Sequence, residues 1–332
     1  MRQRLSTARS GMRRAALLAA VVALGAVGVV AQQNFDDVEV QWLHVQDNIY
    51  MLVGAGGNIT LSVGDDGVLV VDTQFEGMAE KNIAAVREIA GTRPIRYIVN
   101  THAHPDHIGG NAAIAAAGAQ VVAGNFAGQI AFRTGGGNPA FIMAHENALN
   151  RIIAPAEGEP PPFEAWPTDT FFTAAKDFFF NDEAIFLRHQ PNAHTDGDIL
   201  VHFRESDVVA AGDLYVNQGF PFIDIDNGGS LSGIVDAANT ILEITVPADK
   251  QEGGTYVVPG HGRLSDEADV VEYRDMLTII RDRLVAMIDD GLTLEQVLES
   301  NVVLDYEARY GSEGGFNPTS RFLTNAYNSL VN

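Results

Sequence analysis

Short apolar runs and segments with helical spacing follow one another along the first half of the chain. Residues 41–53 (QWLHVQDNIYMLV) alternate in part and predict a strand, and the runs ITLSVG and VLVVD predict two more, joined by the hairpin signal DDG at 65–67. Apolar residues recur at helical spacing over 77–90, and the apolar run IRYIVN at 95–100 follows. We expect a helix over 77–90 and a strand over 95–100, with a further helix over 108–117 and a short strand over 119–124.

The second half has a similar outline. The runs AIFLRH, ILVHF, DVVAAGD and YVVPGHG predict strands, and helices are expected over 230–243, 270–287 and 292–300. Because strands and helices alternate in both halves, the pattern predicts an α/β protein with two packed sheets and helices outside.

Residues 133–168 interrupt this pattern. They are rich in glycine and proline, and the stretch MAHENALNRII at 143–153 between them predicts one helix. We treat 133–168 as an insert, either a lid over a site or a solvent-exposed connection.

The N-terminus has the composition of an export signal. Five arginines and no acidic residue precede the apolar run at 15–30, and small residues follow at 29–31. We predict a cleaved signal peptide at 1–31, with an uncleaved anchor as the alternative, and an exported, periplasmic or secreted protein. Arg13 and Arg14 allow a twin-arginine signal. Residues 32–332 then form a single domain with a helical region from about 265 and no stable membrane insertion.

Charge and cysteine content exclude several functions. The chain of 332 residues carries a net charge of −22, and removal of 1–31 would make it more negative still. So acidic a body repels phosphate backbones, which argues against nucleic acid as a partner. The sequence has no cysteine, so neither a disulfide nor a thiol nucleophile is available.

The segment THAHPDH at 101–107 holds three of the nine histidines. Imidazole and carboxylate are ligands for zinc and similar ions. Residues two apart in an extended segment point the same way, so His102 and His104 can share one ion. Pro105 then turns the chain and directs Asp106 and His107 toward a second ion.

Further ligands are expected where other apolar strands end. His194 lies in NAHTDGD, Asp213 in AAGDLYV and His261 in VVPGHGR. A polar residue at the end of a core strand is held by a rigid sheet, as a metal site requires.

These segments together resemble the metallo-beta-lactamase fold superfamily. The matching elements are VLVVDT, THAHPDH, AHTDGD, AGD and PGHG, spread over about residues 40–265. The resemblance implies an αββα four-layer sandwich of two mixed sheets with outer helices. It also implies a binuclear site in which one metal is held by His102, His104 and His194, and the other by Asp106, His107 and His261, with Asp213 bridging.

Two positions depart from the lactamases of this superfamily. Those enzymes have cysteine or serine where this chain has Asp213, whereas glyoxalase II, many lactonases and esterase-like members have aspartate. Gln74 replaces a glycine that usually follows the strand motif, so the loop there is expected to differ. Of the two, Asp213 favours ester or lactone cleavage over lactam cleavage.

We therefore expect a beta-lactamase-like hydrolase with two Zn²⁺ ions, Fe or Mn being possible instead. A metal-bound hydroxide would attack the activated carbonyl of a small lactam, lactone, ester or thioester, and Asp106 would orient it or carry its proton. The alternative is a non-heme iron oxidoreductase of the persulfide dioxygenase type on the same fold. Such enzymes commonly lack a histidine at the position of His261, which counts against this alternative.

Other polar residues have weaker assignments. Asp72 and Asp198 are candidates to hold metal-bound histidines through their second nitrogen. Tyr215 could donate to an oxyanion and Arg263 could bind a substrate carboxylate, although packing and solvent exposure are the favoured interpretations. Phe220 and Phe222 are expected either in an apolar wall of the site or in the core.

Overall fold

The computed structural model describes residues 34–120, 138–156, 158–251 and 253–331. The predicted signal at 1–31 and most of the strand expected at 119–124 lie outside the described residues. From Phe35 onward the described chain forms one unit. The described residues contain no helix that is both long and apolar enough to cross a membrane.

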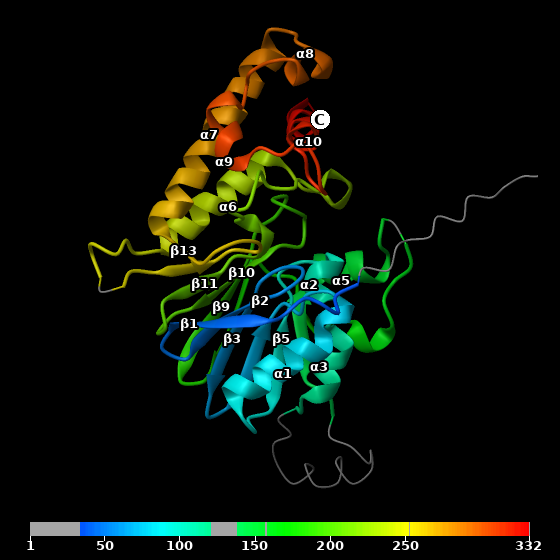
Figure 1. The fold of residues 1–332 in the computed structure, drawn as a ribbon, viewed down its shortest axis with the longest axis vertical. Coiled ribbons are helices and arrows are strands. Elements are labelled where there is room, and N and C mark those ends of the chain that lie inside the picture. The colour runs from blue at the N-terminus through cyan, green and yellow to red at the C-terminus, as the bar shows by residue number, and fades with distance from the viewer. Residues whose placement is uncertain (1–33, 121–137, 157, 252, 332) are drawn as a thin grey trace, which may run out of the picture. The chain divides into compact units, whose positions relative to one another are not determined.

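The first sheet contains its strands in chain order, and Figure 1 shows it with α1 and α3 alongside. The first three neighbouring pairs are antiparallel and the last three are parallel. The strands are β1 (Gln41–Gln46), β2 (Ile49–Val53), β3 (Ile59–Gly64), β4 (Gly67–Val71), β5 (Ile95–Val99), β6 (Phe141–His145) and β7 (Asp169–Phe171).

The second sheet has the order β13-β12-β11-β10-β9-β8, and only the β11–β12 pair is parallel. Both sheets are therefore mixed. The strands are β8 (Ala175–Phe180), β9 (Glu183–His189), β10 (Ile199–Phe203), β11 (Val208–Ala210), β12 (Tyr256–Val258) and β13 (Ser265–Asp266).

Strand β4 shows how the layers are packed. Side chains alternate along a strand, so Leu69 and Val71 face the core between the sheets, while Val68 and Val70 pack toward the helices outside. A strand buried on both faces has to be apolar at every position, which explains the run VLVV. The helices outside the first sheet are α1 (Ala79–Ala90) and α3 (Asn111–Ala117).

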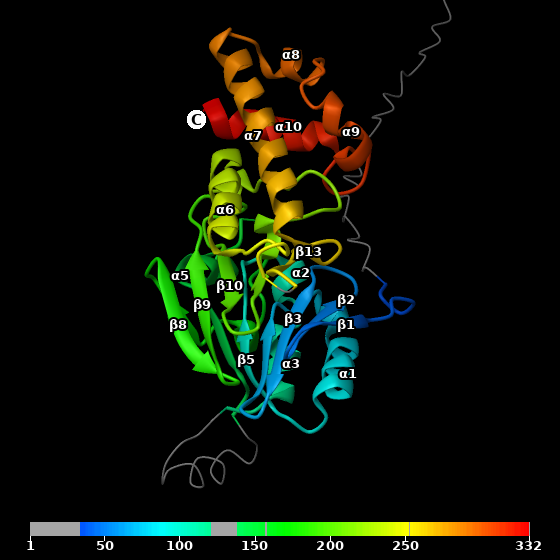
Figure 2. The same ribbon diagram turned by 90° about the vertical axis from the view of Figure 1, so that its left-hand side faces the viewer.

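Outside the second sheet lie α6 (Leu231–Ile244) and α7 (Glu267–Asp289), as Figure 2 shows from a second direction. They confirm the predicted αββα sandwich. The chain ends with α8 (Leu294–Leu298), α9 (Leu304–Tyr310) and α10 (Thr319–Val331), and Phe322 of α10 is fully buried in the same core.

The structure corrects three local predictions. The run 41–53 is a hairpin of two strands, because Asp47 takes a left-handed conformation (φ 46°) and turns the chain. The helix expected over 143–153 is present as α5 (Glu146–Ile153), but its first three expected residues belong to β6. Because β6 pairs with β5 and β7, this strand of the 133–168 segment belongs to the first sheet. The helix expected over 108–117 is divided into α2 (Pro105–Ile108) and α3.

Candidate metal centre

The residues predicted as metal ligands all follow the carboxyl ends of strands. His102 and His104 come after β5, and the N-terminal proline of α2 turns the chain so that Asp106 and His107 lie in its single turn. The other three follow strands of the second sheet: His194 after β9, Asp213 in the 3-10 helix η3 (Gly212–Leu214) after β11, and His261 after β12. The two sheets thus contribute to one site.

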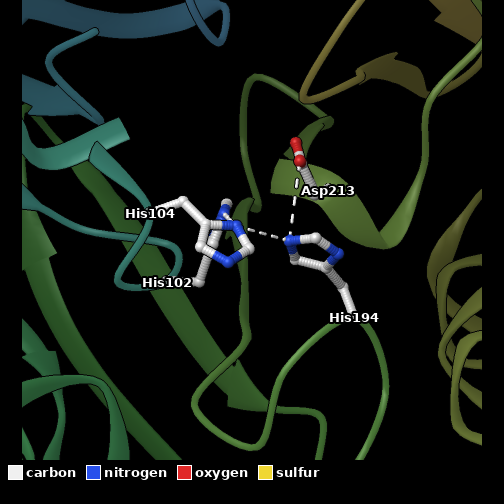
Figure 3. A group of neighbouring side chains, drawn as sticks. All are labelled: His102, His104, His194 and Asp213. Carbon is white, nitrogen blue, oxygen red and sulfur yellow. Dashed lines mark hydrogen bonds and ion pairs between the residues drawn. The ribbon is translucent and has the colours of Figure 1, made fainter. Parts of the chain in front are cut away.

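Three imidazoles converge in the first group of side chains (Figure 3). His104 Nδ1 lies 3.1 Å from His102 Nε2 and 2.9 Å from His194 Nε2. Asp213 Oδ2 lies 3.6 Å from His194 Nε2. These four residues offer ligand atoms close enough to hold one ion.

Hydrogen bonds on the far side of His102 define its tautomer. The single hydroxyl proton of Thr101 is donated to Asp72 Oδ2 at 2.7 Å, so Thr101 Oγ1 can only accept from His102 Nδ1 at 3.0 Å. The proton of a neutral His102 therefore sits on Nδ1. Its Nε2 lone pair points into the group.

The same reasoning applies to the other two imidazoles. His104 Nε2 donates to Asp224 Oδ2 at 2.7 Å, and His194 Nδ1 donates to the Phe222 carbonyl at 2.7 Å. Each ring then has a bare nitrogen facing the others. Bare nitrogens this close repel one another unless a proton or a cation lies between them, and three of them form a donor set that suits a divalent metal.

The second group consists of Asp106, His107 and His261. His261 Nε2 lies 3.3 Å from Asp106 Oδ2 and 3.4 Å from His107 Nε2. His107 Nδ1 donates to Asp72 Oδ2 at 2.7 Å, so Nε2 is the nitrogen that faces the other members of the group.

Asp213 faces both groups. Its Oδ2 is directed toward His194, and its Oδ1 lies 3.2 Å from His107 Nε2 and 3.5 Å from His261 Nε2. The buried Oδ1 makes no well-formed hydrogen bond within the described residues. A buried carboxylate oxygen without a partner is costly, and a cation next to it removes that cost. The donor set around Asp213 therefore fits two ions.

The two groups differ in the pKa of their histidines. Burial, together with neighbouring His107, lowers the pKa of His102 well below its usual value, and burial lowers the pKa of His194 to about 4. Burial also acts on His261, but Asp213 and Asp106 outweigh it and raise its pKa to about 9.

The carboxylates respond in the opposite sense. Burial raises the pKa of Asp213, but His261 and His107 outweigh it and hold that pKa well below its usual range. Burial likewise raises the pKa of Asp106, which His107 and His261 bring below its usual value. Both carboxylates are therefore ionised, and positive charge next to them stabilises this form.

Glycines let two backbone segments approach these ligands. A Cβ on Gly57 would lie 2.2 Å from His107 Cε1, and one on Gly260 would lie 2.0 Å from Asp213 Oδ1. Any larger residue at either position would displace a candidate ligand. This explains why glycine occupies these positions in the GAGG and PGHG turns.

Of the two carboxylates predicted to hold ligand histidines, Asp72 has that contact, with His107. It also accepts hydrogen bonds from Thr101 N and Oγ1, and so links the loop after β4 to the loop after β5. Asp198 contacts no ligand side chain. It accepts hydrogen bonds from Thr195 N and Oγ1, both at 2.7 Å, and so closes the turn that carries His194.

Two further residues at the site carry no signal in the sequence. Asp224, at the start of the 3-10 helix η4 (Ile225–Asn227), accepts a hydrogen bond from His104. Burial raises the pKa of Asp224, but the hydrogen bond from His104 outweighs burial, and the pKa is lowered to about 2. Asn58 donates to the carbonyls of Pro259 and Gly262 and so holds the His261 turn. Neither residue lies in a metal-binding motif, so only the folded chain shows their role.

The weak substrate candidates have other partners. The Tyr215 hydroxyl donates to Ser265 Oγ at 2.9 Å in the core, and Arg263 pairs with Asp269 at the surface. The structure therefore supports neither as a substrate residue. Phe220 stacks on Phe322 in the core, whereas the Phe222 ring lies 6.0 Å from the His104 ring and 5.9 Å from the His194 ring.

Gln74, the residue in place of the usual glycine, is fully buried with φ 59°. It thus adopts a conformation that glycine adopts most easily.

A model of the metallo-beta-lactamase superfamily matches residues 52–274, well over half of the chain, and the chain belongs to that superfamily. This assignment confirms the predicted family. It also confirms the predicted class, a beta-lactamase-like metal-dependent hydrolase.

Curated relatives are similar at low identity. The type 2 metallo-beta-lactamase of a Bacillus species is 21% identical over 71% of this chain and 78% of its own length. The linear primary-alkylsulfatase of a Pseudomonas species is 24% identical over 70% of this chain and 48% of its own length. The chain therefore spans about half the length of that alkylsulfatase.

Solved structures confirm the fold. The stereoselective inverting sec-alkylsulfatase from Pseudomonas sp. has a TM-score of 0.64 at 14% identity, covering 87% of this chain and 50% of that one. The metallo-beta-lactamase from Pontibacter korlensis has a TM-score of 0.51 at 14% identity, covering 72% of this chain and 99% of that one. At such identities the likeness concerns the fold alone.

Proposed function

We propose that this protein is an exported two-metal hydrolase that cleaves a small lactam, lactone, ester or thioester. The observation that carries the proposal is Asp213, a largely buried carboxylate that directs one oxygen toward each of two converging ligand groups. The family assignment supports the hydrolytic class.

The first ion would be held by His102, His104 and His194, and the second by Asp106, His107 and His261, with Asp213 shared. The proposed metal is zinc, which imidazole and carboxylate ligands suit, with iron or manganese as alternatives. When bound, divalent ions supply Lewis acidity toward a carbonyl and bring the pKa of a coordinated water near neutrality.

The chain's own residues prepare the site for this chemistry. Asp72 and Asp224 orient His107 and His104, so that the ligand nitrogens need not reorganise when an ion or substrate binds. The side chains of Asp106 and His261 are 23% and 30% exposed, so water and substrate can reach them. Asp106, ionised and at the open side, is placed to orient a water molecule and to accept its proton.

The residue at position 213 favours ester-like substrates. Asp213 stands where the resemblance places cysteine or serine in the lactamases, and aspartate in esterase-like members. No thiol is available anywhere in the chain, so a covalent cysteine mechanism is excluded. Because relatives include alkylsulfatases, alkyl sulfates belong among the substrates to be tested.

Export remains a proposal drawn from residues 1–31, namely five arginines followed by an apolar run. N-terminal sequencing of protein recovered from the periplasm or medium tests it. A mature N-terminus near residue 32 is expected, and recovery of uncleaved chain from the membrane fraction would support an anchor instead.

The iron oxidoreductase is disfavoured by His261, which lies 3.3 Å from Asp106 in the second group. The proposed function is tested with zinc-loaded full chain and a panel of beta-lactams, acyl lactones, aryl esters, thioesters and alkyl sulfates. We expect turnover of at least one carbonyl substrate, and its loss in Asp106→Ala but not in Asp226→Ala, a change at an exposed carboxylate. If the panel yields no turnover, or if Asp106→Ala retains it, the proposed chemistry is wrong.

A further inference from the structure

An arginine of the C-terminal helix α10 lies against the aromatic residue that borders the first ligand group. The Arg321 guanidinium carbon is 4.4 Å from the centre of the Phe222 ring and 4.5 Å from that of Phe316. The two rings themselves meet at 5.0 Å and 67°. Arg321 also donates from one terminal nitrogen to the Phe316 carbonyl at 2.7 Å, so its position is defined by three contacts.

Phe222 connects this arginine to the candidate metal centre. Its ring lies next to the rings of His104 and His194, and its carbonyl accepts the proton of His194 Nδ1. The Phe222 ring therefore contacts both the guanidinium group and the rings of two candidate ligands. Arg321 is exposed, and so is Phe316, at 69%.

Arg321 differs from every other basic residue between Glu267 and Val331. Arg274, Arg281, Arg283 and Arg309 each pair with a carboxylate of the chain. Within the described residues, Arg321 pairs with none, and its remaining N–H groups make no hydrogen bond. In a chain with 43 acidic and 21 basic residues, an unpaired arginine beside the site is a local exception.

We propose that Arg321 binds a carboxylate of the substrate beside an apolar wall made by Phe222 and Phe316, while the bond to be cleaved lies at the candidate ligands. This proposal rests on the proposed function and narrows its substrate class to carboxylate-bearing molecules with an apolar part. Guanidinium suits this task because its planar N–H groups match the two oxygens of a carboxylate. Stacking on two rings holds it in place before the substrate arrives, which reduces the entropy lost on binding.

The position of Arg321 explains why the resemblance did not reveal it. The family model ends at residue 274, and α10 begins at Thr319. The C-terminal helices thus contribute to the substrate side of the site as well as covering the second sheet.

The first test compares two esters with the same leaving group, mono-4-nitrophenyl succinate and neutral 4-nitrophenyl butyrate, on metal-loaded full chain. Arg321→Gln should lower kcat/KM for the succinate ester about tenfold or more, because a charge-assisted hydrogen bond is lost. It should change kcat/KM for the butyrate ester less than about twofold. Arg321→Lys should recover part of the loss, and Arg309→Gln, which removes a paired arginine, should affect neither ester.

The second test needs no turnover. Calorimetric titration measures the Kd of 4-phenylbutyrate and of its neutral amide for wild type and Arg321→Gln, both metal-loaded. Because the metal content is the same, a difference between the proteins reports Arg321. We expect about tenfold weaker binding of the acid to the variant and unchanged binding of the amide.

The outcomes separate the two proposals. If wild type cleaves neither ester but binds 4-phenylbutyrate through Arg321, the carboxylate site stands and the proposed ester chemistry fails. If both esters lose activity equally in Arg321→Gln, or if the acid binds both proteins with the same Kd or neither protein at all, the carboxylate site is refuted.

Discussion

The two ligand groups that share Asp213 are built differently. In the first, three histidines have their outer nitrogens occupied by a hydroxyl, a carboxylate and a carbonyl, and burial holds two of them neutral. In the second, ionised carboxylates surround His107 and His261, whose pKa values are raised. The first group offers bare nitrogens near neutral pH, whereas the second holds protons that an ion must displace.

This difference shows that one short motif can serve two environments. His102 and His107 are five positions apart, yet the proline between them places their rings in separate groups. We expect the first ion to be bound more tightly than the second, because a metal entering the second group must compete with protons.

The largest effect is expected from Asp213, the residue common to both groups. Asp213→Asn should lower kcat/KM by about a thousandfold or more, since the shared negative charge is lost. Metal content should fall at both groups. Kinetics on the panel substrate measure kcat/KM, and elemental analysis measures the metal content. A variant that keeps both ions would show that Asp213 is not needed to hold them.

Asp106→Ala is expected to act on the second group alone. It should lower kcat by about 10²- to 10⁴-fold through loss of proton transfer and of a ligand. Because the first group is intact, one ion should remain, and circular dichroism should show an unchanged fold. Loss of both ions would mean that the groups do not load independently.

Substitution of either of two carboxylates outside the ligand set should weaken metal binding, mainly at one group. Asp72→Asn removes the negative charge that accepts from His107, and Asp224→Asn removes the one that accepts from His104. Each should reduce affinity chiefly for one ion, by about 10- to 100-fold, measured by competition with a chelator. Asp72→Asn should also weaken the first group to a smaller extent, because Asp72 accepts from the Thr101 hydroxyl that contacts His102. Asp226→Asn serves as the control in the same loop, and an equal loss at both groups would contradict the assignment.

The smallest effect is expected at Asn58, which supports the His261 turn. Asn58→Ala removes two hydrogen bonds to backbone carbonyls and should lower the free energy of unfolding by about 1–3 kcal/mol. Urea denaturation measures this change. Wild-type stability in the variant would show that the turn does not depend on Asn58.

The parts of the fold that could be predicted carry a local signal. The apolar run of β4 and the helical spacing of α6 and α7 have the periods of their elements, and the structure has them close to the expected bounds. The single strand expected over 41–53 failed at Asp47, because its left-handed turn leaves the apolar alternation almost uninterrupted. The helix expected over 143–153 begins only at Glu146, because β6, which takes up the residues before it, gains its stability from neighbouring strands and not from local propensity.

The residues of the candidate site also divide into those with a signal in the sequence and those without one. His102 to His107 form a motif, and His194, Asp213 and His261 end apolar runs, so all could be proposed from the sequence. Asp224 and Arg321 could not, because their significance comes from contacts with residues distant in the chain: Asp224 with His104, and Arg321 with Phe222.

The central claim is that Asp213 joins two ion sites, and the metal content of purified full chain tests it most directly. Elemental analysis after loading and extensive dialysis should give about two divalent ions per chain. A single tightly bound iron per chain, with no second ion taken up on further loading, would contradict the account and favour the iron oxidoreductase.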